Sequence, residues 1–261
     1  MSVSVARETR AEGGFVARVT IDRAAKLNAL DRATLAEIIG AMTGLADDPA
    51  LRLAVVTGAG GRAFIGSADI NDLAALDADS ARGFITAVHV CCDAFRHLPV
   101  PTIARIDGYA LGAGLELAAA CDFRVASDRS VFGMPEVRIG LPSVVEAALL
   151  LPLIGPARTR KLLLTGENIG AEEALEWGLV DRIVPADELD VAVEALAASI
   201  LAAGPHAVRL QKSLILDWEE MHTTAAVDRG IDGFVEAFAT DEPHRMTNAT
   251  RAAMQARRKA H

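Results

Sequence analysis

The sequence has little of what marks a secreted or membrane-spanning protein. Its 261 residues include three cysteines, Cys91, Cys92 and Cys121. Their odd number and their lack of metal-ligand spacing indicate reduced thiols rather than a disulfide framework. The longest apolar runs are too short to cross a bilayer, and the first residues contain no apolar signal segment. We therefore predict a cytoplasmic protein with no membrane partner.

Excess positive charge is also absent. Lysine and arginine number 26 against 35 aspartates and glutamates, which gives a net charge of −9. Because general nucleic-acid and membrane-surface binders need a basic face, both classes are disfavoured. The sequence also lacks internal repeats, low-complexity segments, a P-loop and a GxGxxG fingerprint. What it does have is 51% hydrophobic residues, enough to bury one large core.

Short β-branched segments alternate with segments of helical period as far as residue 185. Residues 2–9 and 14–21 flank a Gly-Gly turn and predict a β-hairpin, and Asp31 is a suitable N-cap for the helix that follows. After residue 185 every segment has helical character, with a break at Pro243. We predict an α/β core over 1–185 and a helical C-terminal region over 186–261.

One glutamate stands where its neighbours are all apolar. Glu116 lies in ALGAGLELAAACD, and a buried carboxylate without a partner usually takes up a proton. The Gly-rich turn before it leaves backbone N–H groups pointing at one spot, which suits negative charge developing on an oxygen. A second acid, Glu136, follows Pro135 in FGMPEVRIGLP. Two carboxylates and backbone donors together favour proton transfer beside a carbonyl.

Five segments, in their order and spacing, resemble the crotonase superfamily and most of all its enoyl-CoA hydratases. They are DRAAKLNALD, GRAFIGSADI, RIDGYALGAGLELAAACDFRVAS, FGMPEVRIGLP and LLLTGENIGAEEALEWGLVDRIVP. The resemblance covers nearly all of residues 14–185 and, more loosely, the helical C-terminus. It implies an α/β fold built as a spiral of ββα turns. It also implies that the C-terminal helices assemble the chain into a homotrimer or homohexamer.

The resemblance also implies a role for particular residues. Members bind acyl-CoA thioesters and hold the thioester oxygen with two backbone N–H groups, here those of Ala68 and Ala113. Glu116 matches the glutamate that activates water, and Glu136 matches the one that exchanges a proton with the substrate α-carbon. The positions that match the CoA-binding residues are Lys26, Ala68, Asp69, Ile70, Asn71 and Ala113. Coenzyme A is part of the substrate, so no separate cofactor and no metal are implied.

The sequence departs from the family pattern in three places. Ala113 stands where a glycine is commonest, and IGSAD replaces Ala-Gly-Ala-Asp. Because both sites contribute backbone N–H groups, small side chains are tolerable if the backbone angles stay accessible. The third departure is PSVVEAALLLPLIG, in place of a glycine-rich stretch. Its Ser143 and Glu146 have capping-box spacing, which we prefer to a further catalytic acid. His89 lacks a metal-ligand pattern and is interpreted as a packing or surface residue.

The leading hypothesis is an enzyme that adds water across the 2,3 double bond of an enoyl-CoA to give 3-hydroxyacyl-CoA. An enoyl-CoA isomerase, or another crotonase reaction such as thioester hydrolysis or decarboxylation, is the enzymatic alternative. Isomerases commonly keep one of the two glutamates, so the presence of both favours hydration. A non-enzymatic alternative is an acyl-CoA- or RNA-binding protein without activity. The negative net charge disfavours RNA, and the two acids disfavour loss of activity.

Overall fold

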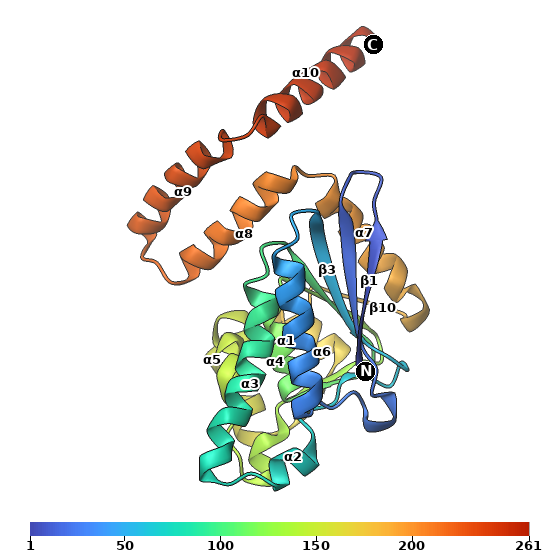
Figure 1. The fold of residues 1–261 in the computed structure, drawn as a ribbon, viewed down its shortest axis with the longest axis vertical. Helices are drawn as coiled ribbons and strands as arrows, with labels where there is room; N and C mark the ends of the chain where they lie inside the picture. Colours follow the sequence, from blue (N-terminus) through green and yellow to red (C-terminus); the bar gives the residue numbers. More distant parts are fainter. Residues whose placement is uncertain (261) are drawn as a thin grey trace. The chain divides into compact units, whose positions relative to one another are not determined.

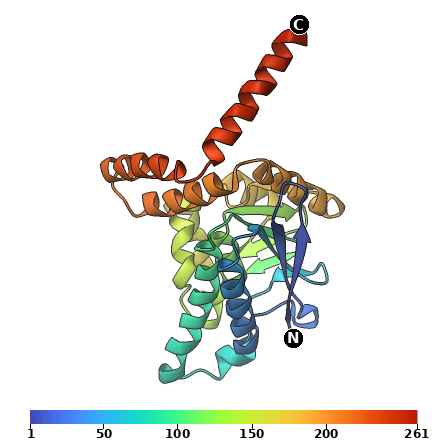
Figure 2. The same cartoon turned by 45° about the horizontal axis from the view of Figure 1, so that its top comes forward.

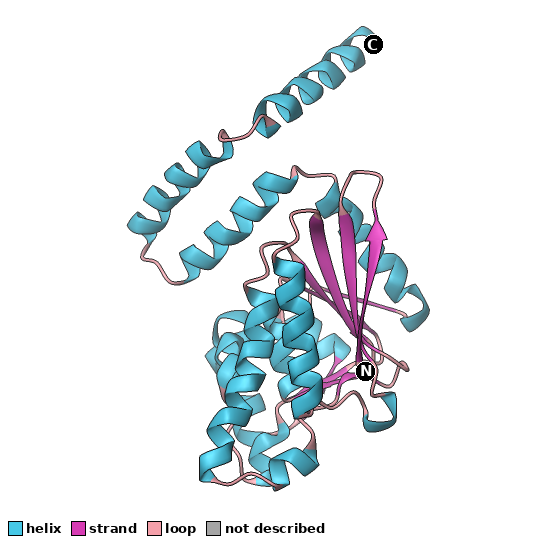
Figure 3. Cartoon of the chain, in the orientation of Figure 1, coloured by secondary structure: helices cyan, strands magenta, loops and turns pink. Residues whose placement is uncertain are grey.

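The computed structural model describes residues 1–260, and the side chains of residues 1–258. They form two compact units, the first Met1–Ala197 and the second beginning at Ala198. Every strand of the described residues lies in the first unit, and the second contains helices only (Figure 3). The boundary predicted at residue 185 precedes helix α7 (Leu189–Leu201), most of which belongs to the first unit.

The larger sheet has six strands in the order β1-β2-β3-β5-β7-β10. Their bounds are Val3–Thr9, Phe15–Ile21, Leu51–Gly58, Thr102–Ile106, Phe123–Ser127 and Arg182–Val184. Strands β1 and β2 are antiparallel, with Val3 opposite Ile21, which confirms the predicted hairpin. All other neighbours are parallel. Strand β3 lies between β2 and β5 and is buried along nearly its whole length, as expected for a central parallel strand.

A smaller sheet repeats the same progression along the chain. Its order is β4-β6-β8-β9, with bounds Ala63–Ile65, Tyr109–Leu111, Val131–Gly133 and Asn168–Gly170. Each of β3, β5 and β7 in the larger sheet is followed along the chain by β4, β6 or β8 in the smaller one. Because β4, β6 and β8 are parallel, successive strand pairs advance in one direction. This is the spiral of ββα turns that the family resemblance implies.

Helical segments complete the turns of the spiral. The α-helices of the first unit are α1 (Arg32–Ala46), α2 (Ile70–Ala74), α3 (Ala78–Arg96), α4 (Ala113–Ala120), α5 (Leu150–Thr165), α6 (Ala171–Trp177) and α7. Short 3-10 helices are η1 (Ala24–Lys26), η2 (Pro135–Ile139), η3 (Val145–Leu149) and η4 (Ala186–Glu188). Asp31 caps α1 as predicted, because its Oδ1 accepts the Thr34 N–H at 2.8 Å. Helices α1 and α3 lie side by side in both views (Figures 1 and 2).

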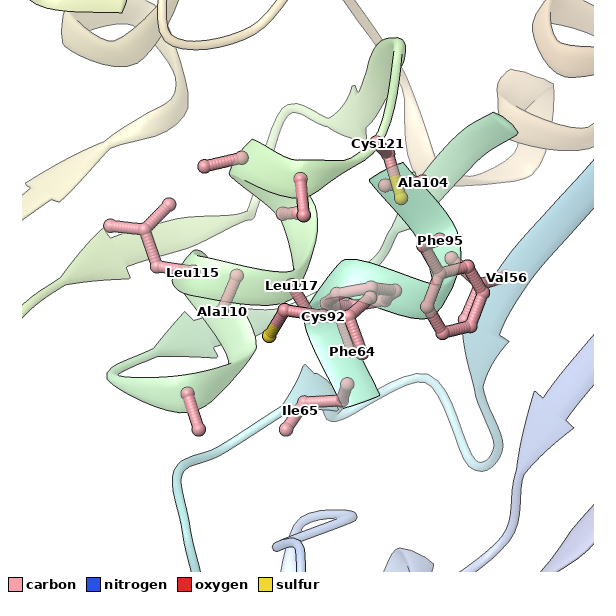
Figure 4. Packing of buried hydrophobic residues seen from close by; sticks show 14 of the residues in the cluster. Val56, Phe64, Ile65, Cys92, Phe95, Ala104, Ala110, Leu115, Leu117 and Cys121 are labelled. Carbon is pink, nitrogen blue, oxygen red and sulfur yellow. The ribbon is translucent and has the colours of Figure 1, made fainter. Parts of the chain in front are cut away.

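Helix α4 runs through the core of the first unit. All eight of its residues are buried, and it packs against α3, η3, β4 and β6. Gly114 permits the contact with β4, because a Cβ atom there would lie 2.2 Å from the Ile65 carbonyl oxygen. Figure 4 shows Leu115 and Leu117 of α4 in the same apolar cluster as Cys92 of α3. Glu116 therefore lies between two residues that pack in the core.

After the last turn of α7, the second unit contains helices α8 (Pro205–Glu219), α9 (Thr223–Ala237) and α10 (Glu242–Ala260). The interruption between α9 and α10 lies just before Pro243, where the sequence predicts a break. Buried Glu242 accepts the backbone N–H groups of His206 at 3.1 Å and Ala207 at 2.9 Å, which ties α10 to the start of α8. Among the described residues, no single helix is both long and apolar enough to cross a membrane, and one bent pair of helices passes that test only by length and composition.

Candidate active site

Glu116 is buried in α4 and holds its proton unusually tightly. Its exposed fraction is 5%. Burial and, after it, the negative charges of Glu136 and Glu146 raise the pKa of its carboxyl to about 8. The backbone N–H of Ala147 offsets part of this increase. Glu116 is therefore mostly protonated near neutral pH, as the sequence predicts for a carboxyl among apolar residues.

Glu136 approaches the start of α4 from η2. A Cβ atom on Gly112, the N-cap of α4, would lie 2.2 Å from Glu136 Oε1. Gly112 also has a φ of +51°, which L side chains rarely adopt. A glycine is therefore required there for two reasons, backbone conformation and room for the carboxylate. The other oxygen of Glu136, Oε2, accepts a hydrogen bond from Ser143 Oγ at 2.7 Å.

Ala113 follows Gly112 as the first residue of α4. Its N–H is one of the four at a helix start that have no partner within the helix. Ala113 does not have a positive φ, so the methyl group that replaces the family's usual hydrogen is accommodated.

Ala68 lies beyond the end of β4, in an isolated parallel bridge with Leu30. This bridge uses the N–H groups of Leu30, which donates to Ser67 O at 2.9 Å, and of Asp69, which donates to Leu30 O at 2.8 Å. The N–H of Ala68 points the other way and has no acceptor within the described residues. Ser67 Oγ lies 3.5 Å from the position of a Cβ on Gly112. The residues just before Ala68 and Ala113, Ser67 and Gly112, therefore lie close together.

The residues that match CoA-binding positions, apart from Ala113 on α4, lie at or beside the start of α2. Asp69 caps this helix, since its Oδ1 accepts the Asn71 N–H at 3.0 Å, and its Oδ2 lies 3.7 Å from Lys26 Nζ. Burial alone would raise the pKa of Asp69, but Asn71, Arg23 and Lys26 together lower it. The side chain of Asp69 is thus held by the protein itself. Lys26, Ile70 and Asn71 are exposed.

The capping-box interpretation of Ser143 and Glu146 is wrong. Helix η3 begins at Val145 with Val144 as its N-cap and no side-chain cap. Ser143 lies outside that cap and donates to Glu136 instead. Glu146 is buried, and its Oε1 lies 2.6 Å from Nδ1 of His89 on α3. No local sequence pattern indicates this pair, because the two residues are 57 positions apart.

The assembled site has two acids and two backbone donors. Glu116 holds a proton near neutral pH, and Glu136 lies beside the start of the same helix. The N–H groups of Ala68 and Ala113 are available to an oxygen. Within the described part of the chain, no group of three or more His, Cys, Asp or Glu side chains is placed to hold a metal ion. The arrangement can move one proton between two carboxyl groups while an adjacent oxygen gains negative charge.

Comparison with known proteins agrees with this geometry. Residues 11–256 match the family model described as enoyl-CoA hydratase/isomerase. The chain is 38% identical over 223 residues to a crotonyl-CoA hydratase of Syntrophomonas wolfei, covering 85% of this chain and 86% of the relative. It is 34% identical over 230 residues to a short-chain-enoyl-CoA hydratase of Clostridium acetobutylicum, covering 88% of each.

A solved structure extends the likeness to the whole fold. The crystal structure of an enoyl-CoA hydratase from Bacillus anthracis superimposes with a TM-score of 0.91 and 29% sequence identity, covering 97% of each chain. The family match spans both the α/β unit and most of the helical unit. The chain therefore belongs to the enoyl-CoA hydratase/isomerase family.

Proposed function

We propose that this chain hydrates the 2,3 double bond of enoyl-CoA thioesters to give 3-hydroxyacyl-CoA. The observation that carries the proposal is the pairing of buried Glu116 with Glu136 at the start of α4. A single acid would suffice for many proton transfers, whereas adding water across a double bond moves two protons. The hydratase names of two relatives support the same reaction.

In this mechanism the thioester oxygen accepts hydrogen bonds from the N–H groups of Ala68 and Ala113. In the reacting form the single proton of the pair has moved from Glu116 to Glu136. As water attacks the β-carbon, the ionised Glu116 takes the water's proton and the oxygen of the thioester gains negative charge. Glu136 then gives a proton to the α-carbon, and the thioester carbonyl forms again. One proton enters from water and one leaves to carbon, so the pair of acids ends with the single proton it began with.

The CoA part of the substrate lies, in this proposal, along the start of α2. Lys26 is a cation placed to meet a phosphate, and the exposed Ile70 and Asn71 offer apolar and amide surface. Asp69 caps α2 and so stabilises the start of this helix. The reaction draws only on substrate, water and protein groups, so it calls for no additional cofactor. A cytoplasmic location remains a prediction of the sequence.

The proposed reaction is tested by following the absorbance of the conjugated thioester. We expect it to fall when the protein is mixed with crotonyl-CoA or with at least one longer or branched enoyl-CoA, since hydration removes the conjugation. A protein that binds CoA but leaves every member of the panel unchanged would refute the proposal. RNA retained with the protein on a nitrocellulose filter, without hydration, would support the non-enzymatic alternative.

We further propose that the first unit carries the acyl-CoA site and that the helices after residue 185 assemble copies of the chain into a homotrimer or homohexamer. In the second unit a groove of about 570 Å³ is lined by apolar side chains of α8 and α9. Large apolar residues of α9 are exposed there, among them Val227, Ile231, Phe234 and Val235. A surface of this kind is typical of a protein interface.

Light scattering at micromolar concentration is expected to give a mass of three or six chains. We expect Ile231→Glu to lower that mass, because it places a charge in the apolar surface. Glu219→Gln, also in the second unit but outside the groove lining, is the matched control and is expected to leave the mass unchanged. A stable monomer in the parent protein would contradict the assembly proposal.

A further inference from the structure

The backbone around Ala68 is held by a short parallel bridge to Leu30. In this bridge Leu30 donates its N–H to Ser67 O at 2.9 Å and accepts the N–H of Asp69 at 2.8 Å. The bridge is isolated, because it lies outside the strands of both sheets. Two hydrogen bonds alone constrain a backbone weakly. The direction of the Ala68 N–H therefore depends on what else joins the two sides of the bridge.

One arginine joins them. The residue that follows each side of the bridge is a helix N-cap, Asp31 for α1 and Asp69 for α2. Nη2 of Arg23 lies 2.6 Å from Asp31 Oδ2 and 3.2 Å from Asp69 Oδ2. Its Nη1 donates a hydrogen bond to the carbonyl oxygen of Ala29. A single guanidinium thus contacts both chains of the bridge, directly beside Ala68.

The segment that carries Arg23 is itself fixed in an unusual conformation. Leu27 and Asn28 have φ values of +53° and +56°, which residues other than glycine rarely adopt. The Asn28 side chain is buried, and its Nδ2 donates to Ala63 O of β4 at 2.8 Å. Its Oδ1 accepts the backbone N–H of Arg23 at 2.9 Å. The backbone of Arg23 is therefore anchored to β4, the strand that leads to Ala68.

The charge of Arg23 is already used by these contacts. Its side chain is 13% exposed, and two carboxylates neutralise the guanidinium. A phosphate approaching Arg23 would also meet the negative charges of Asp31 and Asp69. Lys26, whose side chain is 58% exposed, is better placed to meet the phosphates of CoA. The surroundings of Arg23 therefore favour a role inside the protein over direct contact with the substrate.

We propose that Arg23 is a positioning residue for the backbone N–H of Ala68. By pairing with Asp31 and Asp69 together, it fixes the Leu30–Ala68 bridge and so aims this N–H at the thioester oxygen. The inference rests on the proposed function, in which that oxygen gains negative charge. A backbone donor stabilises such a charge only when its distance and angle are held closely.

Steady-state kinetics with crotonyl-CoA give the first test. Arg23→Gln removes the charge that holds the two N-cap acids together. We expect kcat to fall by roughly 10²-fold, the effect of a small misplacement of a catalytic group, while KM changes little. Arg23→Lys keeps the charge but lacks the planar fork, so it should restore part of the lost turnover.

The second test observes the thioester oxygen without any reaction. Butyryl-CoA has no 2,3 double bond, so it binds without being hydrated. Infrared difference spectra of ¹³C- and ¹²C-carbonyl butyryl-CoA isolate the carbonyl band of the bound ligand. In the parent we expect this band at a lower frequency than in free butyryl-CoA, because hydrogen bonds to the oxygen weaken the C=O bond. In Arg23→Gln the band should move part of the way back.

Arg105→Gln is the matched control. The Arg105 side chain is 16% exposed and is paired with Asp190 through two contacts, at 2.6 and 3.2 Å. It resembles Arg23 in burial and pairing, but it lies on β5 and contacts Asp190 and Thr57. We expect its loss to leave kcat, KM and the carbonyl band unchanged, even if the thermal unfolding midpoint falls. If Arg23→Gln does not fold, Arg23→Lys should show smaller changes in the same direction.

Two results in a folded Arg23 variant would overturn the inference. Parental kcat and an unmoved band, with only a lower thermal unfolding midpoint, would make Arg23 purely structural. A raised KM with parental kcat would show that Arg23 contacts CoA. An unshifted band in the parent would also overturn it. If the parent hydrates no enoyl-CoA but the band still shifts and responds to Arg23→Gln, the proposed function alone fails.

Discussion

Glu136→Gln is expected to cut turnover by roughly 10²–10⁴-fold, the contribution of a positioned proton-transfer group. The amide is nearly isosteric with the carboxylate and can still accept the hydrogen bond from Ser143 Oγ. It cannot give a proton to carbon and take it back. We therefore expect kcat to fall while KM for crotonyl-CoA changes little, as measured by steady-state kinetics.

The controls separate chemistry from folding. The thermal unfolding midpoint of the Glu136→Gln protein should match that of the parent. Glu172→Gln, which removes a carboxylate on the surface of α6, should retain full turnover. Equal activity in Glu136→Gln and the parent would remove Glu136 from the mechanism.

Ala113→Pro is expected to lower turnover by about 10²–10³-fold, because it removes one of the two N–H groups proposed to hold the thioester oxygen. Proline is well tolerated at the first position of a helix, where the N–H has no partner within the helix. Ala113 occupies that position in α4. The loss should therefore appear in kcat measured with a saturating enoyl-CoA, in a protein that still folds.

Ala113→Gly is the matched variant at the same site. It keeps the N–H and restores the commoner family residue, so activity within a few-fold of the parent is expected. A folded Ala113→Pro protein with near-parental turnover would show that the thioester oxygen is held elsewhere.

The burial of Glu116 could be predicted because local sequence determines it. The run of glycine, alanine and leucine around it has no other polar side chain, so the helix that carries it had to lie in the core. The same holds for Asp31, whose N-cap role depends on residues three positions away. The order of the ββα turns followed from motifs that resemble a known family.

The surroundings of Glu146 could not be predicted in this way. Its spacing from Ser143 fits a capping box, but η3 begins at Val145 with Val144 as its N-cap, so Ser143 is not in the capping position. Ser143 instead contacts Glu136, and Glu146 contacts His89. The spacing of Ser143 and Glu146 reveals neither partner. A tertiary contact across 57 residues leaves no trace in a single sequence.

The most direct test of the proposed chemistry uses crotonyl-CoA in ¹⁸O-labelled water, with the products identified by mass spectrometry. We predict one ¹⁸O atom in a 3-hydroxybutyryl-CoA whose thioester is intact, because the oxygen of water bonds to the β-carbon. The Glu136→Gln protein should form this product at a rate lower by roughly 10²–10⁴-fold. Free CoA with labelled crotonate, or a C4 acyl-CoA of unchanged mass, would contradict the account.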